Sequence, residues 1–296
     1  MIKKNKKSGG KHIAPKTKYN EVLKFYALTV DNFFENPDKI VRYAKSLPKH
    51  PDPAARWPGK RTKELWEINK ELNDSIVLKV LICYYDLTYQ DISWSNSSLQ
   101  FQEIPRMSKN KNDVINKGWI HSDQGPDTTH ELAGIIYLTP DIDPDSGTSL
   151  YQIYQRNDKE YKVLQKSFAK KILYKDLQLI HQMDFEAEII NAWSMKGQNS
   201  SLSDKDKFNE AYFLEKYKEQ EELFTEKTRF ANIYNRLIMY DTNEFHRANN
   251  YWNDDGKDPR LTLVFFIGGF NVGTFPLEKI KGGEYDEFIG HQSKIW

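Results

Sequence analysis

Short runs in which apolar and polar residues alternate, or in which apolar residues follow one another, recur along this chain and limit the folds open to it. Successive side chains of a β-strand point to opposite faces of a sheet, so a period of two residues is typical of strands with one buried face. Turn-forming residues separate several of the runs, notably before Gly147. Strands are expected at residues 93–104, 118–121, 132–138, 148–154, 235–241 and 260–267. Several short strands of this kind predict a mainly β fold, built either as a barrel or as two packed sheets.

Helices are expected near the start of the chain and in one long segment between the strands. Asn36 is placed to cap a helix that has Pro37 at its first position, and Pro48 ends the apolar periodicity that follows. A second helical run extends over about residues 73–85. Between about residues 155 and 230, Lys and Glu are dense and apolar residues stand at helical spacing, which predicts a mostly helical insertion.

The composition is that of a globular protein without a strongly charged partner. The 296 residues are 39% hydrophobic and 14% aromatic, which is enough for a substantial buried core. Lys and Arg number 43 and Asp and Glu number 42, so the formal charge of +1 does not indicate a nucleic acid or a membrane as partner. Basic residues and glycines mark residues 1–20 as a disordered tail, with a nucleic-acid-binding arm as the alternative, and residues 21–296 as a single domain.

The single cysteine, Cys83, allows neither an internal disulfide nor a thiolate zinc site, and it is expected to be a small core residue. No apolar segment resembles a secretory signal, and no run approaches the roughly 18 apolar residues of a membrane span. These features predict a cytoplasmic protein.

His121 and Asp123 stand two residues apart at the end of an expected strand, so their side chains share one face and can converge on one cation. The pair alone is weak support, because such a spacing arises by chance and Asp123 could cap a surface turn. A local metal loop that uses Asp127 and His130 with His121 is a further alternative. We disfavour it because no strand geometry aligns His130 with His121.

Downstream, His246 follows another expected strand, and Arg260 opens the apolar run 260–267. Arg260 and Thr262 share one face of that strand. A guanidinium in a buried strand is costly unless an anionic group meets it, and its planar fork suits a carboxylate. We therefore expect Arg260 and Thr262 to bind a dicarboxylate co-substrate. Pairing of Arg260 with a structural Asp or Glu is the alternative.

Two histidines and one carboxylate on one face of a metal, with neighbouring coordination positions open, are typical of non-haem iron oxygenases. The chain resembles the prolyl-4-hydroxylase-like iron(II)- and 2-oxoglutarate-dependent oxygenases, in particular a branch found in bacteria and their viruses. The segments that carry the resemblance are residues 30–47, 57–62, 120–152 and 235–267. In all it spans roughly residues 28–154 and 230–270, and it leaves the insertion unexplained.

The resemblance implies a double-stranded β-helix, or jelly roll, in which His121, Asp123 and His246 are the catalytic iron(II) ligands. It implies that Arg260 binds the 5-carboxylate of 2-oxoglutarate. Tyr137 is then either a second hydrogen-bond donor to 2-oxoglutarate or a core tyrosine. Relatives of the collagen-hydroxylase type carry lysine near the position of Arg260, so their peptide substrate is not transferred to this chain.

The implied reaction uses O2 and couples oxidative decarboxylation of 2-oxoglutarate to oxidation of a C–H bond in an unidentified substrate. Hydroxylation is preferred because Asp123 is retained, whereas related halogenases carry a small residue there. A non-catalytic jelly-roll binding module and a zinc-dependent hydrolase with the same ligands remain open as alternatives, although the hydrolase gives Arg260 no role. The sequence does not choose between protein, metabolite and nucleobase substrates, and the insertion is expected to cover the barrel mouth.

Overall fold

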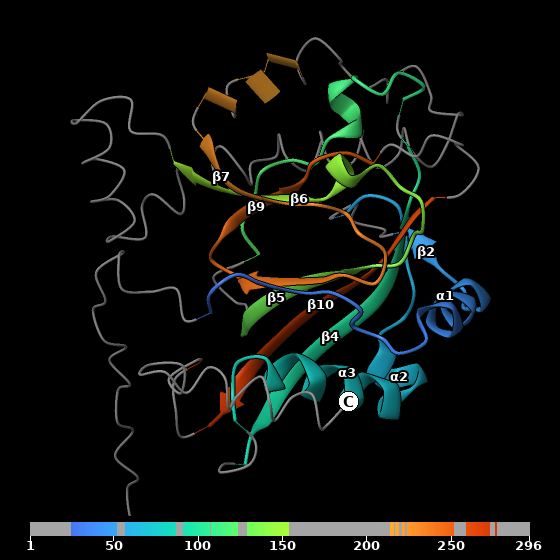
Figure 1. Ribbon diagram of the computed structural model, residues 1–296, viewed down its shortest axis with the longest axis vertical. Coiled ribbons are helices and arrows are strands. Elements are labelled where there is room, and N and C mark those ends of the chain that lie inside the picture. The colour runs from blue at the N-terminus through green and yellow to red at the C-terminus, as the bar shows by residue number, and fades with distance from the viewer. Residues whose placement is uncertain are drawn as a thin grey trace, which may run out of the picture.

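Antiparallel β-sheet predominates in the computed structural model of this protein, as expected from the sequence (Figure 1). The structure describes residues 25–51, 57–86, 91–106, 108–123, 129–153, 214–215, 217–218, 221–222, 224–251, 259–272 and 276. The expected basic tail and most of the expected helical insertion lie outside these residues, as does Asp127.

The strands form two sheets, and the smaller sheet lies over one face of the larger one (Figure 1). The larger sheet has the order β1-β8-β5-β10-β4-β3-β2. Its strands are β1 Leu28–Val30, β2 His50–Pro51, β3 Lys60–Arg61, β4 Ser93–Ile104, β5 His130–Tyr137, β8 Leu237–Asp241 and β10 Arg260–Asn271. The smaller sheet has the order β7-β6-β9, with β6 Thr148–Ile153, β7 Phe224–Phe230 and β9 Phe245–Ala248.

The helices lie on the far side of the larger sheet or at its edge (Figure 1). Helix α1 Pro37–Ser46 begins as expected, because the Asn36 side chain accepts a hydrogen bond from the Lys39 N–H. Helix α3 Lys70–Ile82 begins a few residues before its expected start, because Asn69 caps it in the same way. The short helix α2 Leu65–Ile68 was not expected. No helix in the described part of the chain is long and apolar enough to span a membrane.

The buried side chains form two groups, one on each face of the larger sheet. The outer core lies between the larger sheet and the helices, and it includes Val80 of α3 together with Leu263 and Phe265 of β10. Cys83, half buried, packs against it. The inner cluster lies between the two sheets and consists of Ala133, Tyr137, Leu150, Ile238 and Tyr240. Because alternate residues of β10 point to opposite faces, Arg260 and Thr262 face the inner side.

Two sequence-based expectations about extended segments were wrong. Residues 118–121 do not form a strand, and only an isolated bridge joins His121 to His246. Residues 224–230, assigned to the end of the helical insertion, form strand β7. Exposed polar and charged residues fill this strand because it is the edge of the smaller sheet, so its sequence lacks the apolar alternation of a half-buried strand.

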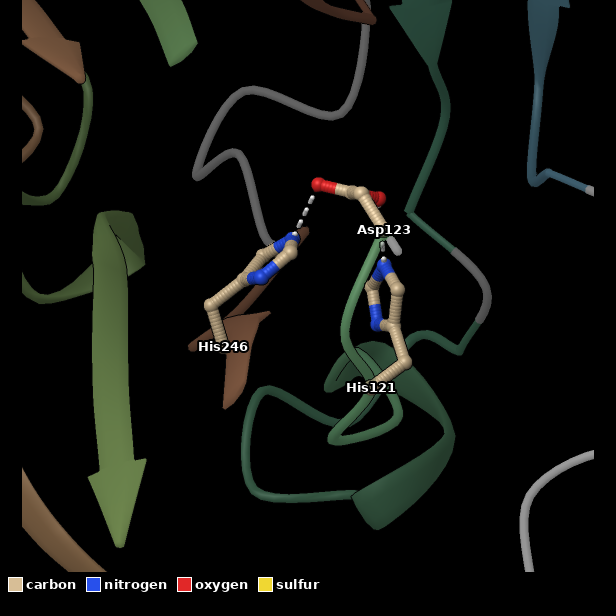
Figure 2. A group of neighbouring side chains, drawn as sticks. All are labelled: His121, Asp123 and His246. Atoms are coloured by element: carbon tan, nitrogen blue, oxygen red, sulfur yellow. Dashed lines mark ion pairs between the residues drawn. The ribbon is translucent and has the colours of Figure 1, made fainter. Parts of the chain in front are cut away.

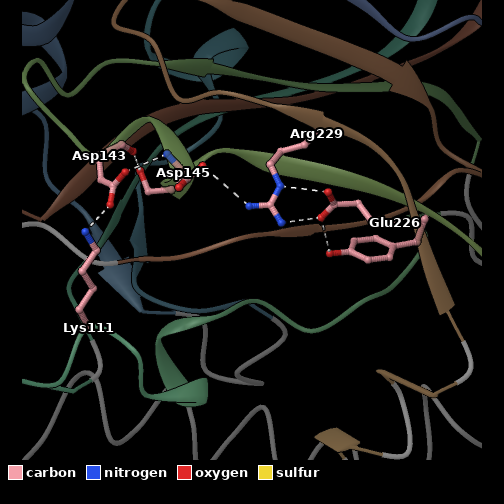
Figure 3. A network of polar contacts seen from close by, with 7 residues as sticks. Lys111, Asp143, Asp145, Glu226 and Arg229 are labelled. Carbon is pink, nitrogen blue, oxygen red and sulfur yellow. Dashed lines mark hydrogen bonds and ion pairs between the residues drawn. The ribbon is translucent and has the colours of Figure 1, made fainter.

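An exposed polar network joins β7 to the turn that precedes β6 (Figure 3). Arg229 bonds Glu226 in a bidentate contact and lies 3.8 Å from Asp145. Asp143 accepts a hydrogen bond from the Asp145 N–H and forms an ion pair with Lys111. The neighbouring guanidinium lowers the pKa of Glu226, and Lys111 lowers that of Asp143. Solvated pairs of this kind contribute little to stability, so the network orients the turn more than it holds the fold.

Candidate metal centre

His121, Asp123 and His246 meet at one point between the sheets (Figure 2). One ligand atom from each residue lies within 4.8 Å of the others. Asp123 Oδ1 is 3.6 Å from His121 Nε2, and Asp123 Oδ2 is 3.3 Å from His246 Nε2. In the described part of the chain, no other group of three His, Cys, Asp or Glu side chains has this spacing. His130 belongs to no such group there, and Asp127, which the alternative local loop also uses, lies outside the described residues.

Backbone pairing brings the two histidines together although they are far apart in the sequence. The His121 N–H donates to the His246 carbonyl at 3.0 Å, and the His246 N–H donates to the His121 carbonyl at 2.8 Å. The Asp123 N–H donates to the Thr242 carbonyl at 3.1 Å, so the segment from His121 to Asp123 is also bonded to the chain between β8 and β9. His121 and Asp123 therefore present their side chains on the same side, as the alternation of an extended segment requires.

Main-chain carbonyl groups fix the orientation of both imidazole rings. His121 Nδ1 lies 2.8 Å from the Trp119 carbonyl oxygen, and His246 Nδ1 lies 3.0 Å from the Glu244 carbonyl oxygen. Each Nδ1 can only donate in this contact, so Nε2 of each neutral ring keeps its lone pair on the side of Asp123. Sequence reasoning missed these two carbonyl groups, because any residue two positions before each histidine could supply them.

The centre is buried on one side and open on the other. His246 is 5% exposed and its ring lies 4.6 Å from that of Tyr240, whereas the His121 side chain is 45% exposed. Burial lowers the pKa of His246 to about 4, although the carboxylate of Asp123 opposes the shift. The imidazole is therefore neutral at pH 7, which is the state that binds a metal. A ligand from solvent can reach the centre on the side of His121.

Arg260 carries a buried guanidinium with unused hydrogen-bond donors. The residue is 2% exposed, and its Nε and Nη2 atoms have no hydrogen-bond partner. Its guanidinium carbon lies 5.4 Å from the centroid of the Tyr137 ring and 5.8 Å from that of Tyr251, and no described carboxylate forms an ion pair with it. The hydroxyl of Thr262, on the same face, is also buried without a partner. These unused donors fit a bound carboxylate.

Two buried tyrosines line the site: Tyr137 borders Arg260, and Tyr240 borders the metal ligand His246. Tyr137 stands opposite Thr262 in the sheet, is fully buried, and donates its hydroxyl to Thr148 Oγ1 at 2.9 Å. Burial raises the pKa of Tyr137, and Arg260 opposes this shift. Burial also raises the pKa of Tyr240. The negative charge of Asp123 adds to this shift, and the positive charge of Arg260 opposes it. Tyr137 is thus a buried residue that borders Arg260, and the ring of Tyr240, which sequence reasoning missed, lies beside that of His246.

The residues of the site fit both the metal ion and the dicarboxylate co-substrate that the sequence suggests. Two imidazoles and one carboxylate suit a divalent transition metal and leave the exposed side open. The buried, unpaired guanidinium suits a carboxylate that arrives with a ligand. Sequence reasoning placed these residues from their spacing, and the structure brings His121, Asp123 and His246 together.

Comparison with known proteins gives only distant similarity. No protein-family model and no curated protein matches the sequence. A prolyl hydroxylase from Trichoplax adhaerens, solved with a peptide fragment of hypoxia inducible factor, is similar at 9% identity and a TM-score of 0.40, covering 82% of this chain and 83% of that one. HygX from Streptomyces hygroscopicus, solved with nickel and 2-oxoglutarate, is similar at 12% identity and a TM-score of 0.38, covering 82% and 83%.

An oxidoreductase of the 2-oxoglutarate and iron(II) oxygenase family from Burkholderia pseudomallei is similar at 8% identity and a TM-score of 0.36, covering 82% of this chain and 84% of that one. The proteins from Trichoplax adhaerens and Burkholderia pseudomallei are a prolyl hydroxylase and a member of the 2-oxoglutarate and iron(II) oxygenase family, which are enzymes of the kind that the sequence resembles. Similarity with TM-scores below 0.5 does not establish an activity, so the function proposed for this chain depends on its own residues.

Proposed function

We propose that this protein is an iron(II)- and 2-oxoglutarate-dependent dioxygenase that hydroxylates a C–H bond of an unidentified substrate. The observation that carries the proposal is the buried, unpaired guanidinium of Arg260 on the same inner face as a His, Asp and His cluster. In the overall reaction, 2-oxoglutarate, O2 and a substrate C–H group give succinate, CO2 and a C–OH group. A zinc hydrolase with the same ligands leaves Arg260 without a role.

The arrangement of the strands supports a double-stranded β-helix. In chain order, β4 and β5 belong to the larger sheet, β6 and β7 to the smaller one, β8 to the larger, β9 to the smaller and β10 to the larger. The bridge between His121 and His246 adds one more segment to the smaller sheet, between β4 and β5. The chain thus passes repeatedly between two facing antiparallel sheets, as it does in a jelly roll.

Three side chains would hold the metal. His121 and His246 would each offer Nε2, and Asp123 would offer a carboxylate oxygen, with the histidine rings already fixed through Nδ1. With iron(II) and 2-oxoglutarate bound, the centre would supply the oxidising chemistry. The protein's own part is to fix these ligands in one geometry and to leave the side of His121 open for the substrate.

Arg260 would bind the far carboxylate of 2-oxoglutarate, and the Thr262 hydroxyl would donate a further hydrogen bond. The Nε and Nη2 atoms of Arg260 and the Thr262 hydroxyl lack partners and are shielded from water. A carboxylate there would therefore meet donors that do not first have to release a water molecule. The Tyr137 hydroxyl already bonds Thr148, so we assign it to support Arg260 and not to bind the co-substrate on its own.

Succinate formation tests the proposal without knowledge of the substrate. Purified protein is incubated in air with 2-oxoglutarate and either iron(II), zinc(II) or chelator, and succinate is quantified. Slow uncoupled succinate formation that needs iron(II) is expected, and Asp123→Asn should lower it by more than about tenfold. Arg229→Met, on the exposed edge strand, is the matched control and should match the wild type. A protein that binds iron(II) and 2-oxoglutarate but forms no succinate would be the binding module instead.

A further inference from the structure

A β-bulge interrupts the pairing of β5 with β10 beside the metal centre. The two strands pair in regular register as far as Ile267, which lies opposite Leu132. The next pair joins Gly268 to His130, so Glu131 is the extra residue of the bulge. Bulges change the direction of neighbouring side chains and are common next to active sites.

The bulge turns His130 toward the inner side of the larger sheet. In regular register, His130 would share a face with Leu132, which belongs to the outer core against the helices. Instead, the His130 ring lies 5.6 Å from the ring of Phe266, which packs against the inner cluster. His130 therefore lies on the same side of the sheet as the metal centre.

Specific residues hold this distortion in place. Glu131 Oε1 accepts hydrogen bonds from the backbone N–H groups of Gly269 and Phe270, at 3.1 and 3.4 Å. Gly269 has a φ of +67°, which disfavours other residues. A Cβ atom at Gly268 would lie 2.0 Å from the Thr129 carbonyl oxygen, so only glycine allows the two strands to approach this closely. These contacts therefore fix the direction in which the His130 side chain points.

Thr242 connects His130 to the metal centre. The Thr242 carbonyl accepts the Asp123 N–H at 3.1 Å, and the Thr242 hydroxyl donates to the His130 carbonyl, also at 3.1 Å. One residue thus bonds the backbones of a metal ligand and of His130.

The His130 ring has a free position that faces the protein interior. The side chain is half buried, and its Nε2 atom is buried without a hydrogen-bond partner. A buried nitrogen without a hydrogen-bond partner is costly, and a ligand that supplies the partner removes this cost. Burial lowers the pKa of His130, so the ring is neutral at pH 7.

The surroundings of this nitrogen select the chemistry of a ligand. Two acids belong to this part of the structure: Glu131 follows His130 in the chain, and the backbone of Asp123 is bonded to the same Thr242 as that of His130. Their negative charge disfavours an anionic group at this position. The face of Phe266 supplies an apolar wall beside the ring. An amide or a hydroxyl is uncharged and can either donate or accept, so it can pair with Nε2 in either tautomer of the neutral ring.

We propose that His130 Nε2 binds an uncharged amide or hydroxyl group of the oxidised substrate, at a subsite formed with Phe266 beside the metal centre. The proposal rests on the function proposed above, because a metal bound at the centre would bring the reacting C–H bond of the substrate close to His130. His130 would be a specificity-determining residue that holds the substrate beside the centre.

Paramagnetic relaxation tests the subsite with small probes. The protein is loaded with manganese(II) and 2-oxoglutarate without O2, and the methyl protons of N-methylacetamide and of acetate are observed by NMR in titrations. The relaxation is normalised to the bound manganese and corrected with a magnesium(II) sample. Selective, metal-dependent relaxation of N-methylacetamide is expected, since acetate should be repelled.

Two substitutions separate the hydrogen bond from the packing. His130→Phe keeps a ring against Phe266 and removes Nε2, so it should weaken the binding of N-methylacetamide by about fivefold. His130→Gln places an amide nitrogen near the position of Nε2 and should restore most of the binding. His50→Phe changes an exposed histidine of β2 and is the matched control, with binding equal to the wild type.

Each outcome decides the proposal. Equal relaxation of both probes by the wild type, or unchanged amide binding in His130→Phe, would overturn the subsite while leaving the metal centre intact. Failure of the wild type to bind manganese(II) would refute the metal centre itself, and the subsite with it.

Discussion

Replacing Arg260 with methionine should make the ligand-free protein more stable, although it removes a buried charged residue. The guanidinium is 2% exposed, and its Nε and Nη2 atoms have no partner. Each unmet buried donor costs about 1 to 3 kcal/mol. The two aromatic contacts at 5.4 and 5.8 Å return about 0.5 to 2 kcal/mol each. Since methionine keeps most of the apolar stem, Arg260→Met should raise the free energy of unfolding by about 1 to 2 kcal/mol.

Arg247 supplies the matched control, because it is a buried arginine with partners. It is 6% exposed, donates to the hydroxyl of Tyr217 and forms an ion pair with Glu221. Removing one partner of a buried pair costs about 3 to 5 kcal/mol, and the partial exposure of Glu221 places this case at the lower end. Arg247→Met should therefore lower the free energy of unfolding by about 3 kcal/mol.

Urea unfolding with and without 2-oxoglutarate measures both effects. With zinc(II) present, 2-oxoglutarate at about a hundred times its dissociation constant should stabilise the wild type by about 2.7 kcal/mol and leave Arg260→Met unchanged. If Arg260→Met instead loses stability as Arg247→Met does, Arg260 has a structural partner. The assignment of this residue to a co-substrate would then be wrong.

Further expected results concern the metal ligand, the first helix and the bulge. In the metal-free protein the pKa of His246 falls from 6.5 when unfolded to about 4 when folded, so its contribution to stability is complete above about pH 6.5 and is lost as the pH falls towards 4. The loss is about 3 kcal/mol, and urea titrations of His246→Gln should lack this part of the pH dependence. Asn36→Ala should cost about 1 kcal/mol in urea because the cap of α1 is lost. Gly268→Ala should cost about 1 to 3 kcal/mol, because its Cβ would meet the Thr129 carbonyl oxygen; an unfolding free energy equal to the wild type would contradict the close approach of β5 and β10.

Local rules were sufficient where one segment decides its own structure. The cap of α1 follows from Asn36 and Pro37 alone. The direction of Arg260 and Thr262 follows from alternation within β10, and the pairing of β10 on both edges explains why that strand reads as almost wholly apolar. Such features depend on neighbours in the sequence, so their prediction needs no knowledge of the fold.

Features that depend on pairing between distant segments could not be predicted. The expected strand at residues 118–121 is a single bridge, because this segment bonds β9 only through the pair His121 and His246 and through the Gly118 N–H to the Ala248 carbonyl. Alternation counted along β5 would place His130 on the helix side, and only the pairing with Gly268 reveals the bulge. The carbonyl groups that orient the imidazoles belong to the main chain, so the identity of the side chains does not reveal them.

The two buried arginines show why burial alone does not identify a binding residue. Both lie in strands, Arg247 in β9 and Arg260 in β10, and each is surrounded by apolar or aromatic neighbours. Arg247 follows His246 and so points away from the inner side, where Tyr217 and Glu221 meet its charge. Arg260 points to the inner side, where the described residues offer it aromatic rings and no carboxylate. The face of the sheet, which is fixed by the pairing of the strands, therefore separates a charge that the fold neutralises from one that the described residues leave without an anionic partner.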